Sequence, residues 1–191
     1  MTQLRSKVTT RPHFERYIVS EHLVRQMEAW FQEAGALGVE DVAIVAGYAT
    51  SRPDGVAITA LHPNAERHAG WFEQRDAPEW GELYTFAQPL GMHYLFQIHT
   101  HPPRYGTRHS PRDDAGAFSD QRGFVSIVAP DFSLHGLDLH DRKVTAHERV
   151  TPTIEHPTGW RVWPHEELVR RLVIVPSHVN YQRGEPQAEE A

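Results

Sequence analysis

Two histidines separated by a single residue, His99 and His101, follow an apolar run at residues 94–98 that is short enough to be a buried strand. Alternate side chains leave the same face of a strand, and their Cα atoms lie roughly 6 to 7 Å apart. Two imidazoles placed in this way can close on one metal ion. An isolated pair of this kind is more often two histidines on a solvent-facing strand, so the surrounding residues decide the interpretation.

An acidic residue follows the histidines after a short loop. Pro102 and Pro103 stop the strand, and Ser110 is suited to be a helix N-cap with Asp113 in the first turn. A catalytic zinc ion has three protein ligands and one open position, and two histidines with one aspartate satisfy that count. Because the chain contains no cysteine, a transition metal can be held only by histidine and carboxylate side chains.

These pieces resemble the motif of the JAMM, or MPN-type, metalloproteases, in which an upstream glutamate is followed by H-[ST]-H-P and then by S-x-x-D. Residues 99–102 read H-T-H-P, and residues 110–113 read S-P-R-D. Upstream, Glu40 begins a segment of the form E-x-x-x-x-x-x-G that ends at Gly47, as in the family. The pieces occur in the family's order, and the resemblance extends over about residues 17–139.

The resemblance implies a role for each motif residue. His99, His101 and Asp113 would bind a Zn²⁺ ion that activates a water molecule. Glu40 would be the general base, and Ser110 would hydrogen-bond the developing oxyanion. Taken alone, Glu40 would be interpreted as a solvated carboxylate at the start of a strand, and only its spacing to the downstream motif indicates catalysis.

The loop of the motif departs from the family's pattern. Between Pro102 and Ser110 it has seven residues, one more than is usual. Asp114 is therefore an alternative ligand, although Asp113 keeps the S-x-x-D spacing. His109 could also reach the metal if the insertion remodels the loop, but we interpret it as an ordinary loop histidine.

The elements around the motif are predicted to be mixed. Apolar residues at helical spacing after Ser20 predict an amphipathic helix that ends at Gly35 to Gly38, and a turn at residues 51–55 predicts a β-hairpin. The hairpin strands are expected at 42–49 and 56–61, further strands at 94–98, 124–128, 132–139 and 173–175, short helices at 76–91 and 164–172, and a polar loop at 62–74. Without regular strand-helix alternation, this order favours an α+β fold.

The chain of 191 residues is long enough for one ordinary core. We expect a single JAMM/MPN-type domain over residues 1–182, with a core at about 17–139, a C-terminal extension at 140–182 and a disordered tail at 183–191. The resemblance implies an MPN (JAB)-type domain with a cytidine-deaminase-like mixed β-sheet flanked by helices.

Composition excludes several other classes of function. The formal net charge is −6 and no run of lysine or arginine occurs, so nucleic acid is not an expected partner. No stretch approaches the roughly 20 apolar residues of a membrane span, and the N-terminus lacks a signal-peptide core. We therefore expect a cytoplasmic protein that does not bind membranes.

The function implied by the resemblance is that of a zinc-dependent isopeptidase or peptidase of the deubiquitinase-like, bacterial kind. It would hydrolyse the bond after the C-terminal glycine of a ubiquitin-like protein. Ubiquitin-like proteins or their conjugates would be its partners, together with associated activating or conjugating enzymes. Two alternatives remain open: a non-catalytic MPN-type scaffold, and a zinc amidase that acts on small amides or cell-wall peptides.

Overall fold

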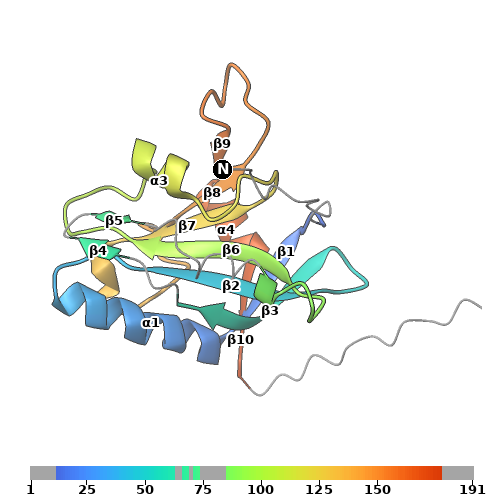
Figure 1. The fold of residues 1–191 in the computed structure, drawn as a ribbon, viewed down its shortest axis with the longest axis horizontal. Helices are drawn as coiled ribbons and strands as arrows, with labels where there is room; N and C mark the ends of the chain where they lie inside the picture. The colour runs from blue at the N-terminus through green and yellow to red at the C-terminus, as the bar shows by residue number, and fades with distance from the viewer. Residues whose placement is uncertain (1–11, 63–65, 69–70, 74–84, 178–191) are drawn as a thin grey trace, which may run out of the picture.

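The computed structural model describes residues 12–62, 66–68, 71–73 and 85–177, and a mixed β-sheet forms its centre. The eight strands follow the order β10-β1-β3-β2-β6-β7-β8-β9. Strand β1 runs parallel to β3 and β10, β6 runs parallel to β7, and the remaining neighbours are antiparallel. Figure 1 shows helix α1 along one side of this sheet and α3 on the opposite side. The predicted α+β class is confirmed.

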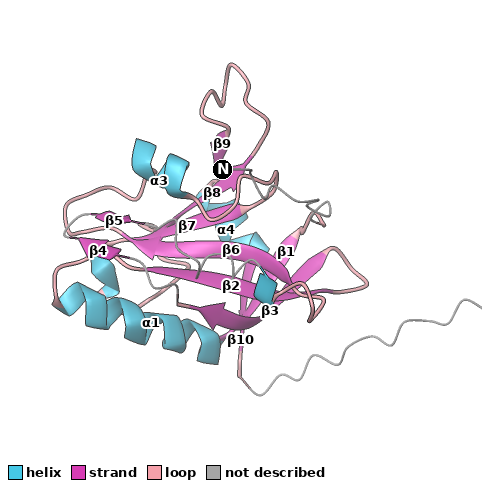
Figure 2. Ribbon diagram, viewed as in Figure 1, coloured by secondary structure: helices cyan, strands magenta, loops and turns pink. Residues whose placement is uncertain are grey.

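The bounds of the elements are as follows, and Figure 2 distinguishes helices from strands. The sheet contains β1 (Arg16–Ser20), β2 (Val42–Ala49), β3 (Asp54–Leu61), β6 (His93–Thr100), β7 (Val125–Ala129), β8 (Thr145–Arg149), β9 (Trp160–Val162) and β10 (Leu172–Val175). A separate hairpin contains β4 (Glu66–His68) and β5 (Trp71–Glu73). The helices are α1 (Glu21–Ala36), α3 (Pro111–Gly116) and α4 (His165–Arg171), and η1 (Asp131–Ser133) is a 3-10 turn.

Helix α1 is the amphipathic helix that the spacing predicted. The hydroxyl of its N-cap, Ser20, accepts a hydrogen bond from the Leu23 amide, as a capping serine should. The apolar face is buried at Leu23, Met27, Phe31 and Ala34. This face packs against the core that the sheet supplies, so the helix is stabilised by tertiary burial in addition to its cap.

Strands β2 and β3 form the predicted hairpin, and β2 lies between β3 and β6 at the centre of the sheet. Residues of β2 are almost all buried, which explains why the strand shows an unbroken apolar run and no alternation. The predicted strand at 94–98 is also confirmed but is longer, because β6 continues to Thr100. The predictions of β7, α4 and β10 are confirmed within one or two residues at each end.

Two parts of the sequence-based prediction are wrong. Residues 132–139 were expected to form a strand but form η1 and irregular chain, from which Leu137 and Leu139 enter the core. Their apolar alternation therefore reports burial and not a strand. The strand beside β7 is β8, whose sequence T-A-H-E-R is too polar for periodicity to reveal. Within the expected loop at 62–74, β4 and β5 pair as a hairpin.

Other expectations concern residues outside the described ranges. Most of the helix expected at 76–91 and the whole tail at 183–191 belong to this group. Within the described ranges, no helix is long and apolar enough to cross a membrane.

Gly47 marks an irregularity of β2 and provides a test of the backbone packing. The register with β3 shifts at this residue, and a Cβ atom added there would lie 1.9 Å from the carbonyl oxygen of Val56. We therefore expect Gly47→Ala to lower the free energy of unfolding by about 1–3 kcal/mol, as measured by urea denaturation. Gly116→Ala is the control, because its Cβ would contact nothing within 4 Å. Equal stability of the two variants would contradict the close approach of β2 and β3.

Candidate metal centre

Strand β6 carries the two histidines to a fully enclosed position. His99 pairs with Val42 of β2 on one side and with Val128 of β7 on the other, and its side chain is completely buried. His101 follows the end of the strand, where its amide donates to the carbonyl of Ala129 at 2.9 Å. The two Nε2 atoms approach to 3.2 Å. The interpretation of the pair as two exposed histidines is therefore excluded.

Helix α3 returns Asp113 to the histidines. Its N-cap is Ser110, whose hydroxyl accepts the Asp113 amide while the Ser110 amide donates to the Asp113 carboxylate, which is a capping box. The same carboxylate lies 3.5 Å from Nε2 of His99 through Oδ1 and 3.3 Å from Nε2 of His101 through Oδ2. The cap therefore orients the carboxylate that faces the two imidazoles.

The spacing of the three side chains can be compared with the spacing that a metal requires. Tetrahedral ligands at 2.0–2.1 Å from a zinc ion lie roughly 3.3 Å from one another. The contacts between His99, His101 and Asp113 measure 3.2, 3.3 and 3.5 Å. In the part of the chain that the structure describes, this is the one group of three such side chains that could hold a metal ion. The geometry fits a zinc ion with three protein ligands.

The protonation of His101 is directed by its neighbours. Its Nδ1 donates to the carbonyl oxygen of Gly106 at 2.6 Å, so in the neutral imidazole the lone pair is on Nε2, which faces the cluster. Burial alone would lower the pKa of His101, but its hydrogen bonds to Asp113 and Gly106 outweigh burial and raise it. The Nε2 atom is therefore the one that would coordinate a bound cation.

The electrostatics of the other two side chains agree with a cation site. Burial lowers the pKa of His99 to about 3, so its imidazole is neutral at physiological pH. Burial acts to raise the pKa of Asp113, but the hydrogen bond from His101 and the nearby imidazoles hold that pKa well below its usual range. The cluster therefore offers a neutral imidazole and an ionised carboxylate, which are the states that coordinate metals.

Glu40 lies on the same face of the sheet as the two histidines. Val42 pairs with His99 in antiparallel register, and the amide of Thr100 donates to the carbonyl of Asp41 at 3.1 Å. Continuing this register by one residue places Glu40 opposite His101, and opposite residues in antiparallel strands share a face. Sequence spacing and strand register thus bring the predicted base to the predicted ligands.

Glu40 is buried, with an exposed fraction of 4%. Burial raises the pKa of its carboxyl group to about 7, and the charge of Asp113 adds to the increase while His101 opposes it. A carboxyl group with a pKa near neutrality can both take up and release a proton at physiological pH. The interpretation of Glu40 as a solvated carboxylate at a strand start does not fit this environment.

The two alternative ligands contact each other. Oδ1 of Asp114 lies 3.0 Å from Nδ1 of His109. The His109 ring stacks on His147 of β8 at 3.8 Å between centroids, and its centroid is 5.8 Å from that of His99. His109 is therefore a buried residue that fastens the longer loop to β8, and not the ordinary loop histidine that we expected.

The main chain behind His101 is held by the turn η1. The carbonyl of His101 accepts a hydrogen bond from the Phe132 amide at 2.9 Å. Asp131, Phe132 and Ser133 all have positive φ, between 53° and 54°, which is unfavourable for residues other than glycine. Such strain persists where surrounding structure enforces it, and here the turn returns a donor to a candidate ligand's main chain.

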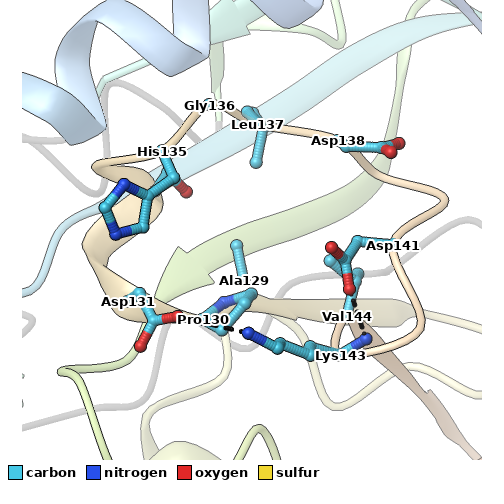
Figure 3. A pocket seen from close by; sticks show the side chains of 11 residues that line it. Ala129, Pro130, Asp131, His135, Gly136, Leu137, Asp138, Asp141, Lys143 and Val144 are labelled. Carbon is cyan, nitrogen blue, oxygen red and sulfur yellow. Dashed lines mark hydrogen bonds and ion pairs between the residues drawn. The ribbon is translucent and has the colours of Figure 1, made fainter.

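A pocket of about 120 Å³ lies beside this turn and is distinct from the cluster of candidate ligands. Figure 3 shows its lining, which includes the side chains of Asp131, Asp138, Asp141 and Lys143. None of the three candidate ligands is among the residues that line it. This pocket is therefore a separate feature from the cluster of candidate ligands.

Two further residues near the site, Asp41 and His62, were not predicted from the sequence. Asp41 is fully buried directly after Glu40, and one of its carboxylate oxygens lies 2.7 Å from Nε2 of His62 at the end of β3. An aspartate at the start of an apolar strand was a possible signal, because such a residue needs a partner if the strand is buried. The partner itself could be known only from the fold.

Comparison with known proteins supports the interpretation of the motif as that of a metalloprotease. No family model matches the chain. A curated protein named probable metalloprotease y4jG, from Sinorhizobium fredii, is 28% identical over 155 residues, which are 79% of this chain and 89% of the relative. The chain resembles the JAMM-type metalloproteases, as its motif predicted.

Solved structures are similar at low sequence identity. Protein DSY2949 from Desulfitobacterium hafniense has a TM-score of 0.53 at 13% identity, over 84% of this chain and 93% of its own, and this likeness shows the fold alone. AF2198, a JAB1/MPN domain protein from Archaeoglobus fulgidus, has a TM-score of 0.44 at 12% identity, over 84% of this chain and 98% of its own.

Metal content provides the direct test of the cluster of candidate ligands. We expect about one zinc ion per purified chain, and loss of that ion in His99→Ala, His101→Ala and Asp113→Ala, because two remaining ligands are too few to retain it. Elemental analysis after dialysis against a weak chelator measures the content. Asp114→Ala is the matched control on the same helix and should retain the metal. Retention by Asp113→Ala with loss by Asp114→Ala would reverse the ligand assignment.

The raised pKa of Glu40 predicts a pH dependence of stability in metal-free protein. The folded state keeps a proton on Glu40 up to about pH 7, whereas the unfolded chain releases it near pH 4.5. Protonation of Glu40 therefore stabilises the folded state fully below about pH 4.5. This stabilisation is lost as the pH rises through about 7.

The comparison with Glu40→Gln isolates the titration of Glu40 and its coupling to His101, because glutamine does not titrate and the remaining groups are common to both proteins. Relative to Glu40→Gln, the wild-type free energy of unfolding should fall by up to about 3 kcal/mol between about pH 5 and pH 8. Urea denaturation in the presence of a chelator measures it. A difference that does not change with pH would show that Glu40 is not buried as the structure places it.

Proposed function

We propose that this chain is a zinc-dependent metalloprotease that hydrolyses the peptide or isopeptide bond after the C-terminal glycine of a ubiquitin-like protein. The observation that carries the proposal is the triangle of His99, His101 and Asp113 at metal-ligand spacing, with Glu40 on the same face. Similarity to a probable metalloprotease over 79% of the chain supports the class of reaction.

The chemistry divides between the metal and the protein. A zinc ion held by the three side chains would polarise the scissile carbonyl and lower the pKa of a coordinated water to about 7. Glu40 accepts a proton from the attacking water and delivers it to the leaving nitrogen. Its pKa is about 7 in the metal-free protein, and a bound cation would lower this pKa towards the ionised form that accepts the proton.

Ser110 is the proposed donor to the carbonyl oxygen. Its hydroxyl oxygen accepts the Asp113 amide, and this leaves the hydroxyl proton available to donate. Donation to the oxygen on which negative charge develops would lower the barrier, and comparable donors contribute on the order of 3 kcal/mol. Ser110 thereby has two compatible roles, as the cap of α3 and as an oxyanion donor.

The depth of the site favours glycine at the cleaved bond. The side chains of Glu40, His99, His101 and Asp113 are each at most 8% exposed. A carbonyl that reaches them must come from a residue without bulk, and the C-terminal glycine of a ubiquitin-like tail meets this requirement. We accordingly propose ubiquitin-like proteins and their conjugates as partners, with activating or conjugating enzymes as associated proteins.

A series of fusions tests the reaction and the substrate together. Ubiquitin-like proteins fused through their terminal glycine to a reporter should be cleaved by wild-type enzyme, while Glu40→Gln should be slower by a hundredfold or more with its zinc retained, because only the proton carrier is lost. Replacing the terminal glycine by leucine should abolish cleavage, since the branched side chain would block access. The rates are measured from the appearance of free reporter.

The same experiment separates the proposal from its alternatives. Equal rates for glycine and leucine fusions would reject the substrate class. Zinc binding without hydrolysis of any fusion would indicate a non-catalytic scaffold, and hydrolysis of small amides alone would indicate a zinc amidase. Normal activity of Glu40→Gln would overturn the proposed role of Glu40.

A further inference from the structure

A buried carboxylate that the proposed mechanism does not use lies beside the metal centre. Asp41 has no exposed surface, and both of its carboxylate oxygens accept hydrogen bonds. Oδ1 accepts the amide of Val42 at 2.9 Å, and Oδ2 accepts from Nε2 of His62 at 2.7 Å. Because a carboxylate can only accept, the imidazole of His62 is the donor in this contact.

The main chain of Asp41 is joined to the middle of the histidine pair. The Asp41 amide donates to the hydroxyl of Thr100 at 3.2 Å, and the Thr100 amide donates to the Asp41 carbonyl at 3.1 Å. Thr100 stands between His99 and His101, and Asp41 directly follows Glu40. A single residue therefore connects the main chain of the proposed base to the main chain that carries two candidate ligands.

His62 reaches this position from the end of β3, and helix α1 orients it. Its ring stacks on that of Trp30, with 4.8 Å between centroids and 10° between planes. Its side chain is 26% exposed, whereas that of Asp41 is fully buried. The pair thus extends from the surface, over α1, to the strand ends at the metal centre.

Loss of the His62 donor would leave the buried Asp41 carboxylate short of a hydrogen bond. A buried carboxylate that loses a hydrogen bond is driven to recover one from water or by rotating its side chain, because a lost donor to a buried charge is costly. Rotation of the Asp41 side chain would break its hydrogen bond with the Val42 amide and loosen the main chain at the start of β2, which the Thr100 hydrogen bonds join to the histidine pair. Small displacements at such a point matter, since residues that orient metal ligands typically change metal affinity or activity by 10- to 100-fold when replaced.

We propose that Asp41 and His62 form a positioning pair for the metal centre, which holds Glu40 and the His99-Thr100-His101 segment at their working separation. This role rests on the proposed function for its catalytic consequence, but it also has a consequence for metal affinity alone. The pair acts through Thr100 and the start of β2, to which Asp41 is hydrogen-bonded.

Two substitutions at His62 separate its hydrogen bond from its packing. His62→Phe keeps a planar ring on Trp30 and removes the donor, whereas His62→Gln keeps a donor for Asp41 and removes the stack. We expect His62→Phe to weaken zinc affinity about tenfold in competition with a chelator, and to lower kcat about tenfold with little change in KM. His62→Gln should retain most of both, which a merely structural role of the ring would not produce.

His140→Phe is the matched control, because it also removes an imidazole donor, from the carbonyl of Leu172, at a partly buried position. It should change neither zinc affinity nor kcat. A folded His62→Phe protein with wild-type affinity and kcat would overturn the proposal, as would a His62→Gln variant that is impaired as strongly as His62→Phe.

Failure of the proposed function is distinguishable from failure of the pair. If wild-type protein binds zinc but cleaves no fusion, the substrate assignment fails and the affinities of the His62 variants still decide the role of the pair. If wild-type protein binds no zinc, both proposals are overturned.

Discussion

Antiparallel pairing of β2 with β6 is the constraint on which the candidate site depends. Because Val42 pairs with His99, continuing the register two residues beyond β2 and β6 places Glu40 opposite His101 on the same face. The two strands lie at the centre of the sheet and are buried on both sides. A shift of register by one residue would move the glutamate to the other face and separate it from the histidines.

Helix α3 supplies the third candidate ligand, Asp113, which also caps the start of the helix. The Asp113 carboxylate satisfies the Ser110 amide at the start of the helix and faces both imidazoles. An aspartate that is fixed by a capping box loses little further freedom when it binds a metal. The loop before it is anchored separately by His109, which stacks on β8, so the additional loop residue does not disturb the carboxylate.

Burial sets the electrostatic character of the centre. It raises the pKa of Glu40 to about 7 and lowers that of His99 to about 3, and in both cases desolvation is the largest cause. Asp113 remains ionised because hydrogen bonds and nearby imidazoles outweigh the same effect. The result is one neutral imidazole, one ionised carboxylate and one carboxyl group with a pKa near neutrality among buried side chains, a combination that suits a divalent cation with a proton carrier nearby.

The sequence by itself determined the features that depend on local spacing: the histidine pair at the end of a strand, the helix after Ser20, the β2-β3 hairpin and the S-x-x-D cap. These follow from side-chain periodicity and capping, which act over a few residues. Only the tertiary structure decided that β8 is a strand, since a polar strand is recognised by the strands that pair with it. It also decided that Glu40 is buried and that its pKa is raised, since both depend on the residues packed around it. It also decided that His62 meets Asp41, because contacts between residues distant in sequence depend on how the strands pair.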